Sequence, residues 1–497
     1  MVSRHAKGRY AHHPLDDRKE SRRPVSIAVL SVASECAPLV KTGGLADVAG
    51  ALPAALGAAD VDMRVLLPGY PAVIAALERA EVVMAEDDLF GGPARVLDGN
   101  AGGLAVMVVE ADHLFAREGS IYLGPDGRDW PDNPERFAAL SWMAARIGHE
   151  GIPGWKPGVV HCHDWQAGLV PDYLAQAGGG AGTLLTIHNI AFNGPFPTDR
   201  IDRLRLPRAR FTAQGFEYWG HGSALKAGLT LADRITTVSP TYAQELMTPD
   251  FGMGLDGVIR ERRDVLAGIL NGIDEDVWNP ATDPLIAPYR TPAGKAANKA
   301  RLRAETGLPD SDGPLCVVVS RLTGQKGLDL LLAALPRLLA RGGQLAVLGS
   351  GEPALEDAFR AAAAHPDVAV RIGYDEGLSH RLIAGGDAIL VPSRFEPCGL
   401  TQLYGLRYGT LPVVALTGGL ADTVINASPA AMAKGVATGI QFHPATPEAL
   451  GAAIDRLCDL WADRKAWARM QKNAMAQPVG WQASARAYAG IYAKIAR

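Results

Sequence analysis

The feature that most constrains the fold is an alternation of short apolar runs with longer stretches of helical periodicity. The runs form two series along the chain. They span residues 27–32, 63–67, 105–109, 159–161, 184–187 and 235–238, and then 315–319, 345–348, 368–372, 388–391 and 413–415. The runs are apolar throughout, which is typical of strands covered on both faces. Strands that alternate with helices in this way predict parallel sheets.

A Pro- and Ala-rich stretch over residues 279–297 separates the two series. At 497 residues the chain is also longer than one hydrophobic core usually supports. We therefore predict an α/β protein with two doubly wound Rossmann-like domains that face each other across a cleft. The predicted organisation is an N-terminal domain over 25–275, a linker over 276–300, a C-terminal domain over 301–475 and, over 476–497, a helix that crosses back to the first domain.

The remaining features of the chain indicate its cell compartment and exclude some classes of partner. Residues 1–24 are polar and basic without an apolar centre, so we expect a disordered tail and no signal peptide. There is no apolar run of about 18 residues, so we expect no membrane span. Five dispersed cysteines without a CxxC pair favour a reducing cytoplasm. The net charge of −4 gives no positive field for a nucleic acid, and the oligomeric state stays open.

The first candidate site follows the first apolar run, because ligands of open α/β sheets bind beyond the carboxyl ends of the strands. Lys41 stands beside the turn of Gly43 and Gly44, and Asp47 lies in the first turn of the helix predicted after it. Backbone N–H groups at such a turn favour an anion. The site therefore predicts phosphate binding, with a surface lysine beside a capped turn as the alternative. Because GxxxxGK[ST] is absent and no GxGxxG follows the first apolar run, nucleotide hydrolysis and dinucleotide redox chemistry lose support.

The phrase Thr-Gly-Gly-Leu-Ala-Asp occurs twice, at residues 42–47 and again at residues 417–422. Each copy precedes an apolar series and predicts a glycine turn that opens a helix. Two interpretations stay open: equivalent roles in the two domains, or coincidence in a chain with 56 glycines.

The second domain offers two cations and a carboxylate at strand ends. Arg321 and Lys326 follow the run 315–319 and could hold a diphosphate together, so that with Lys41 they would neutralise a leaving nucleoside diphosphate without a metal. Glu396 follows the run 388–391 in a loop that prolines stiffen. A carboxylate there could support an oxocarbenium-like transition state or accept hydrogen bonds from sugar hydroxyls. Solvated loop side chains are the alternative.

Histidines and aromatic residues mark the strand ends of the first domain. His161 and His163 could hold a metal as in metal-dependent hydrolases, although no further ligand cluster completes such a site. Residues 119–137 are too rich in glycine and proline for a strand or helix, and they predict a loop that covers a site. Within and near it, Tyr122 and Trp165 offer flat faces for a sugar, with core packing as an equally good account.

Together these segments resemble the bacterial glycogen (starch) synthase family over roughly residues 25 to 495. The motifs that carry the resemblance are Lys41–Asp47, His161–Trp165, Thr186–Ile190, Asn271–Asp274, Ser320–Lys326, Pro392–Leu400 and Thr417–Thr423, in the family's order. The resemblance implies a retaining glycosyltransferase of the GT-B fold that needs no cofactor and no metal. It also implies transfer of glucose from ADP-glucose to the non-reducing end of an α-1,4-glucan such as glycogen.

The resemblance also implies roles for individual residues. The residues with catalytic roles would be Glu396, His188, Lys41 and Asp164. The donor and its nucleotide would contact Lys41, Gly43, Gly44, Arg321, Lys326, Asn271, Cys398, Gly399, Leu400 and Thr401. The acceptor or sugar would contact Tyr122, Asp47, Trp165 and Asn189. The chain departs from the family's usual residues at Cys162, Asn193 and Gly324.

Three alternatives to this function differ in class. One is a related retaining transferase that uses a UDP-sugar and a smaller acceptor. Another is the metal-dependent hydrolase suggested by the two histidines. The third is a catalytically silent glucan-binding protein, which the presence of all the proposed charged residues disfavours.

Overall fold

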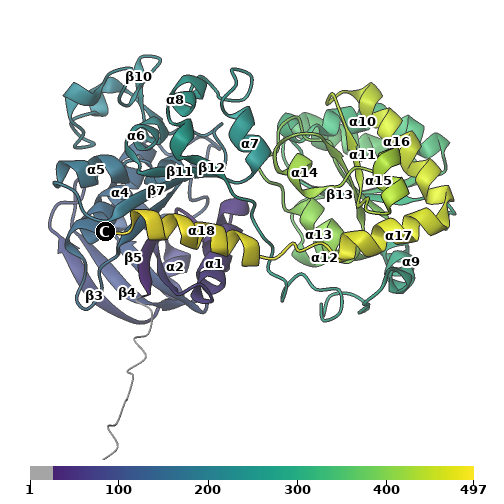
Figure 1. Ribbon diagram of the computed structural model, residues 1–497, viewed down its shortest axis with the longest axis horizontal. Coiled ribbons are helices and arrows are strands. Elements are labelled where there is room, and N and C mark those ends of the chain that lie inside the picture. Colours follow the sequence, from purple (N-terminus) through teal and green to yellow (C-terminus); the bar gives the residue numbers. More distant parts are fainter. Residues whose placement is uncertain (1–25) are drawn as a thin grey trace, which may run out of the picture.

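The computed structural model describes residues 26–497, and the predicted tail over residues 1–24 lies outside them. Two lobes, each with its own sheet and core, lie side by side (Figure 1). The first lobe contains residues 26–272 and 480–497, and the second contains residues 273–479, as the buried cores divide. The predicted fold class, with two mainly parallel α/β lobes, is confirmed.

The first lobe is built on a nine-stranded sheet. In sheet order its strands are β12 (Leu266–Gly268), β11 (Arg234–Thr237), β7 (Gly182–Ile187), β6 (Val159–His163), β1 (Ile27–Val32), β2 (Val61–Pro68), β5 (Leu104–Glu110), β4 (Ala94–Ala101) and β3 (Glu78–Glu86). The strands from β12 to β5 run parallel, and β4 and β3 extend the sheet in antiparallel pairing. A small separate sheet has the order β8 (Pro195–Phe196), β10 (His221–Ser223) and β9 (Glu217–Tyr218).

The helices of this lobe connect its strands. They are α1 (Gly44–Gly57), α2 (Pro71–Ala75), α3 (Asp112–Phe115), α4 (Asn133–Glu150), α5 (Val170–Gln176), α6 (Ala224–Leu231), α7 (Pro240–Glu245) and α8 (Asp256–Glu261). Helix α1 forms because Leu45, Val48, Leu52 and Leu56 recur at helical spacing, and all four are buried.

The second lobe has an all-parallel sheet of six strands. In sheet order these are β15 (Val368–Ile372), β14 (Gln344–Gly349), β13 (Leu315–Val319), β16 (Ala388–Val391), β17 (Leu411–Ala415) and β18 (Ile440–Phe442). Its helices are α9 (Lys295–Thr306), α10 (Leu328–Ala340), α11 (Pro353–Ala362), α12 (Glu376–Gly385), α13 (Thr401–Tyr408), α14 (Gly418–Thr423), α15 (Pro429–Lys434), α16 (Pro447–Ala462) and α17 (Arg464–Met475).

The chain crosses between the lobes twice, and the two crossings lie side by side. The N–H of Ile273 donates to the carbonyl of Val479 at 2.9 Å. After the second crossing, α18 (Gln482–Ile495) lies along the first lobe, as the yellow helix of Figure 1 shows. Its residues Tyr488 and Tyr492 are fully buried in that lobe. The segment 276–300 packs on the second lobe, where Trp278 stacks between two aromatic rings.

Two features differ from the sequence analysis. The additional strands are β3, β4, β8, β9, β10, β12 and β18, and the mostly exposed β3 lacks the apolar run by which the predicted strands were found. Residues 133–137 form the first turn of α4 rather than the end of a loop, because Pro134 occupies the start of the helix, where its missing N–H costs nothing. Across the described residues, none of the helices has both the length and the apolar character needed to cross a bilayer.

Candidate active site between the lobes

The predicted phosphate turn lies just beyond β1 and is shaped by a carboxylate that the sequence analysis had not singled out. Glu35 Oε2 accepts hydrogen bonds from the N–H of Thr42, from Thr42 Oγ1 at 2.8 Å and from the N–H of Gly43 at 3.1 Å. The N–H of Gly43 is thus engaged within the protein. Glu35 positions the turn, and Gly44 begins α1 directly after it.

Lys41 is paired with Asp47 rather than free. Its Nζ lies 2.8 Å from Asp47 Oδ1, and the lysine side chain is 40% exposed. Burial raises the pKa of Asp47, and the hydrogen bond and charge of Lys41 oppose that rise. An anionic ligand that binds Lys41 would therefore replace Asp47 as its partner.

In the second lobe the structure brings Lys326 and Glu396 together. Lys326 Nζ lies 2.6 Å from Glu396 Oε2, which also accepts a hydrogen bond from Ser393 Oγ at 2.9 Å. The Glu396 side chain is only 8% exposed, so this pair is largely shielded from water. The loops that carry the two residues are tied together because Arg394 donates to the carbonyl of Gly324 at 2.7 Å and pairs with Asp329.

Arg321 does not join this pair. Its side chain is exposed, and within residues 26–497 it has no ion-pair partner at 4.0 Å or less. The departure at Gly324 needs no glycine, since a Cβ there would meet its nearest neighbour at 4.0 Å.

Two helix starts face each other between the lobes. A Cβ added to Gly44, at the start of α1, would lie 3.8 Å from Leu400 Cδ1, and Leu400 is the N-cap of α13. Figure 1 likewise places α1 and α13 on the facing sides of the two lobes. Gly399 precedes the cap with φ +73°, a conformation that favours glycine, and Thr401 is the first residue of the helix. Convergent N-termini of this kind attract an anion.

Cys398 and Asn271 lie close together at the same place. The Cys398 thiol is buried, and burial raises its pKa to about 12, while the backbone N–H of Asn271 opposes that rise. The thiol therefore stays protonated at neutral pH, as expected of a packing residue rather than a nucleophile. The side-chain oxygen of Asn271 is buried and has no hydrogen-bond partner within residues 26–497.

Of the three histidines singled out in the sequence, His163 and His188 are hydrogen-bonded to each other, and the ring of His161 lies against that of His163 at a centroid distance of 4.1 Å. His163 Nδ1 and His188 Nε2 lie 2.9 Å apart, and His163 Nε2 lies 3.0 Å from Ser31 Oγ. The ring nitrogens of His161 bind Thr186 Oγ1 at 2.6 Å and Tyr492 OH at 2.8 Å. All four ring nitrogens of His161 and His163 are thus taken by protein side chains, which argues against the metal-dependent hydrolase.

Burial keeps these rings neutral. It lowers the pKa of His188 to about 3, and it also lowers the pKa of His161 to about 3. At neutral pH His188 is an uncharged ring at the end of β7, and it is less buried than His161 or His163.

Asp164 organises the segment that carries His188 and Asn189. Its Oδ1 accepts the N–H of His188 at 2.6 Å and the N–H of Asn189 at 3.3 Å. Burial raises the pKa of Asp164 to about 7, although these two hydrogen bonds oppose the rise. Its backbone has φ +54° and ψ −163°, a region that a non-glycine residue occupies only at a cost of about 1–3 kcal/mol. Strain of this size is common at functional sites.

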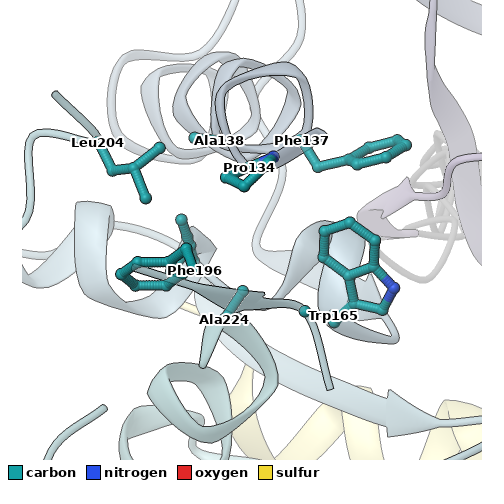
Figure 2. Close-up of a pocket in the computed structure, with 9 residues that line it drawn as sticks. Pro134, Phe137, Ala138, Trp165, Phe196, Leu204 and Ala224 are labelled. Carbon is teal, nitrogen blue, oxygen red and sulfur yellow. The ribbon is translucent and has the colours of Figure 1, made fainter. Parts of the chain in front are cut away.

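Tyr122 lies at this site, whereas Trp165 packs beneath it. Tyr122 OH lies 2.7 Å from Ser34 Oγ and 3.4 Å from Glu35 Oε1. Figure 2 shows Trp165 beside a small apolar cavity with Phe137, whose ring meets the indole edge-on at a centroid distance of 4.9 Å. The packing interpretation describes Trp165 better than a sugar platform, and its contact with the acceptor stays a prediction.

Tyr374 and Glu376 also belong to the cleft and were missed. They follow β15, and Tyr374 is 78% exposed with its hydroxyl donating to Glu376. A hydrogen bond from His380 is the largest cause that lowers the pKa of Glu376 to about 2. The charge of Lys41, across the cleft, also contributes to this lowering. The strand-end rule could have found both residues, since they stand directly after an apolar run.

Comparisons with known proteins agree with this geometry. Residues 28–261 match the family described as starch synthase catalytic domain, and residues 299–476 match glycosyl transferases group 1. The chain is 65% identical to a glycogen synthase of Paracoccus denitrificans over 94% of its length and 99% of that protein's. It is 63% identical to a glycogen synthase of Jannaschia sp. with the same two coverages.

Solved structures show the same fold. The catalytic domain of starch synthase IV from Arabidopsis thaliana, bound to ADP and acarbose, superposes with a TM-score of 0.83 at 31% identity, covering 95% of this chain and 99% of that one. A sucrose-phosphate synthase from Thermosynechococcus elongatus has a TM-score of 0.58 at 17% identity, with coverages of 94% and 98%, and shares the fold alone. From the family matches, the identities and the shared two-lobed architecture, we conclude that the chain belongs to the glycogen and starch synthase family of glycosyltransferases.

Proposed function

We propose that this enzyme transfers glucose from ADP-glucose to the 4-hydroxyl at the non-reducing end of an α-1,4-glucan, with retention of configuration. The observation that carries the proposal is the convergence of the starts of α1 and α13 between the lobes, with Lys41 on one side and Lys326 on the other. Such a site suits a diphosphate that leaves as an anion. Two relatives are named glycogen synthase, and a structural neighbour is described with ADP bound.

Different groups would bind the leaving diphosphate and neutralise its charge. The N–H groups at the starts of α1 and α13 would bind the diphosphate, because the helix dipoles favour negative charge there. Arg321 and Lys326 would neutralise the charge that develops as the bond to the anomeric carbon breaks, while Lys41 would bind from the opposite lobe. Arg321 is the cation most free to do so, since its exposed side chain has no ion pair to break among the described residues.

The groups beside the sugar would act without a strong external base. His188 is neutral, so it would donate or accept a hydrogen bond at the glucose rather than present a cation. Glu396 would support positive charge that develops at the sugar ring or hold a hydroxyl of the glucose. When Lys326 turns to the diphosphate, one carboxylate oxygen of Glu396 is released for this role. Closure of the lobes would exclude water and limit hydrolysis.

The test is incorporation of labelled glucose into glycogen, from ADP-glucose and in parallel from UDP-glucose, with a chelator in both reactions. We expect strong transfer from ADP-glucose that the chelator does not change. Preference for UDP-glucose would favour the related transferase with a different donor. Loss of activity in chelator would revive the metal-dependent alternative, and no transfer from either donor would refute the proposal.

A separate observation supports our proposal for the cell compartment. All five cysteines are free, buried thiols, which fits the reducing cytoplasm that we propose for this enzyme.

A further inference from the structure

The second copy of the repeated phrase lies where the two lobes touch, and the proposed function above does not use it. Thr417 and Gly418 open α14, and Glu245 ends α7 of the first lobe. Glu245 Oε1 accepts a hydrogen bond from Thr417 Oγ1 at 2.8 Å and another from the N–H of Gly418 at 3.0 Å. A residue of one lobe thus holds a turn of the other.

The two copies of the phrase are held in the same way. In the first copy Glu35 accepts from the threonine hydroxyl and from a glycine N–H, as Glu245 does in the second copy. The difference lies in the origin of the carboxylate. Glu35 belongs to the same lobe as its turn, whereas Glu245 reaches across the lobe boundary. The equivalent geometry favours related roles over coincidence.

The turn held by Glu245 is the support on which the Glu396 loop rests. A Cβ on Gly418 would lie 2.0 Å from the carbonyl oxygen of Glu396, and one on Gly419 would lie 2.3 Å from that of Cys398. The N–H of Gly419 also donates to the carbonyls of Glu396 and Pro397, both at 3.1 Å. Only glycine allows backbones to approach so closely, so a shift of the turn must move the loop with it.

A second contact from the same helix reaches the loop directly. Ser239, the N-cap of α7, donates through Oγ to the carbonyl of Pro397 at 2.7 Å. Cys398 in turn packs into the hydrophobic core of the first lobe. One end of α7 therefore holds Thr417 and Gly418, and the other end holds Pro397, the residue after Glu396.

We propose that Glu245 is a positioning residue for Glu396: by fixing Thr417 and Gly418 from the opposite lobe, it places the Glu396 carboxylate only while the lobes are docked. The consequence is that the reactive geometry is assembled together with the closed cleft. An open enzyme that has bound donor would then lack a correctly placed carboxylate. This would limit loss of glucose to water before the acceptor arrives.

The chain provides a matched control for this inference. Asp422, at the other end of α14, accepts the N–H of Thr241 at 2.8 Å and its Oγ1 at 2.7 Å. Glu245→Ala and Asp422→Ala thus each remove two hydrogen bonds between the same two helices. Only the first removes bonds to the glycine turn beneath Glu396.

The experiment measures kcat and KM with ADP-glucose and glycogen, and ADP affinity by calorimetry, for the full-length variants. We expect Glu245→Ala to lower kcat about 10- to 100-fold, because misplacement by about 1 Å costs on that scale. The KM for ADP-glucose and the ADP affinity should stay within about threefold, and Asp422→Ala should lower kcat less than about threefold. Glu245→Gln, which keeps an acceptor oxygen for the turn, should recover most of the loss.

The decisive measurement is kcat of the double variant, in which Glu245→Ala is introduced into the Glu396→Ala enzyme. If Glu245 acts through Glu396, Glu245→Ala should slow the Glu396→Ala enzyme by less than about twofold, since effects of residues that act as a unit are not additive. An equal further loss would overturn the inference, as would equal effects of Glu245→Ala and Asp422→Ala.

Two outcomes keep the inference separate from the proposed function on which it rests. Near-normal turnover of Glu396→Ala would refute the catalytic assignment of Glu396 itself.

Should Glu245→Ala fail to fold, Thr417→Val removes one of the two hydrogen bonds from the side of the turn, and Thr417→Ser keeps the hydroxyl. Thr417→Val should lower kcat by about three- to tenfold with Thr417→Ser near normal, and unchanged turnover in both would overturn the inference.

Discussion

Replacement of Asp164 by asparagine should make the protein more stable at alkaline pH while it slows the reaction. Burial raises the pKa of the Asp164 carboxyl from its ordinary value of 3.8 to about 7. At 1.36 kcal/mol per pH unit this rise corresponds to roughly 4 kcal/mol, which the folded protein gives up when it holds the carboxylate ionised. An asparagine at this position would carry no such charge and would keep an oxygen for the N–H groups of His188 and Asn189.

The sign follows from proton binding by the two states. Because the pKa of Asp164 is raised in the folded protein, the folded state holds a proton between about pH 4 and pH 7 that the unfolded state has released. The protonated carboxyl therefore makes its full contribution to the free energy of unfolding below pH 4. This contribution is lost as the pH rises to 7. Between pH 5.5 and pH 8 the wild type therefore loses roughly 2 kcal/mol of its free energy of unfolding through this group. Asp164→Asn avoids this loss because asparagine does not titrate.

The assay is urea unfolding of both proteins at pH 5.5 and pH 8, followed by circular dichroism. Other titrating groups cancel in the difference between the two proteins at each pH. We expect the stability of Asp164→Asn relative to the wild type to increase by roughly 2 kcal/mol between these pH values. A difference that does not change with pH would refute the assignment of a raised pKa. In parallel, kcat/KM of the wild type should fall as the pH is lowered below 7 if the ionised carboxylate is required. In Asp164→Asn this fall in kcat/KM should be absent.

Three further results are expected. Lys41→Met should raise the KM for ADP-glucose by about 10- to 100-fold in steady-state kinetics, because a charged hydrogen bond contributes about 1.5–3 kcal/mol, and an unchanged KM would remove Lys41 from the donor site. Gly418→Ala should lower both kcat and the unfolding midpoint, because its Cβ would meet Glu396 at 2.0 Å, whereas Gly324→Ala, with 4.0 Å of space, should match the wild type. Lys295→Met should cost roughly 2–4 kcal/mol in urea unfolding, since buried oxygens at 2.7–3.4 Å lose their donor, and ADP affinity should not change.

The buried strands could be predicted because burial on both faces leaves a continuous apolar run. Every such run in the sequence became a strand, including β13 and β16 at the centre of the second sheet. Strand β3 could not be found this way. It is an edge strand with most of its side chains in solvent, so its residues were not selected for apolarity. The start of α4 was missed for a different reason, because a proline such as Pro134 indicates a loop as readily as it suits a first helical turn.

The site was predictable to the extent that it follows strand ends. That rule pointed to Lys41, Lys326 and Glu396, and the structure pairs the last two at 2.6 Å. The rule could not show that Glu35 engages the N–H of Gly43, because that contact depends on how the turn folds back. Nor could it show the contact of Glu245 with the second glycine turn, which joins residues 172 positions apart across two lobes.

The pairing of the lysines explains how an acidic chain can bind an anionic donor. Each proposed phosphate-binding lysine already has a carboxylate partner, Lys41 with Asp47 and Lys326 with Glu396. Binding of a diphosphate at the proposed site would therefore exchange one anion for another at each lysine, and neither cation would have to stay unpaired in a partly buried site. The exchange at Lys326 would have a further effect, because it would free Glu396 when the sugar is present. On this proposal, donor binding and the release of the catalytic carboxylate would be one event.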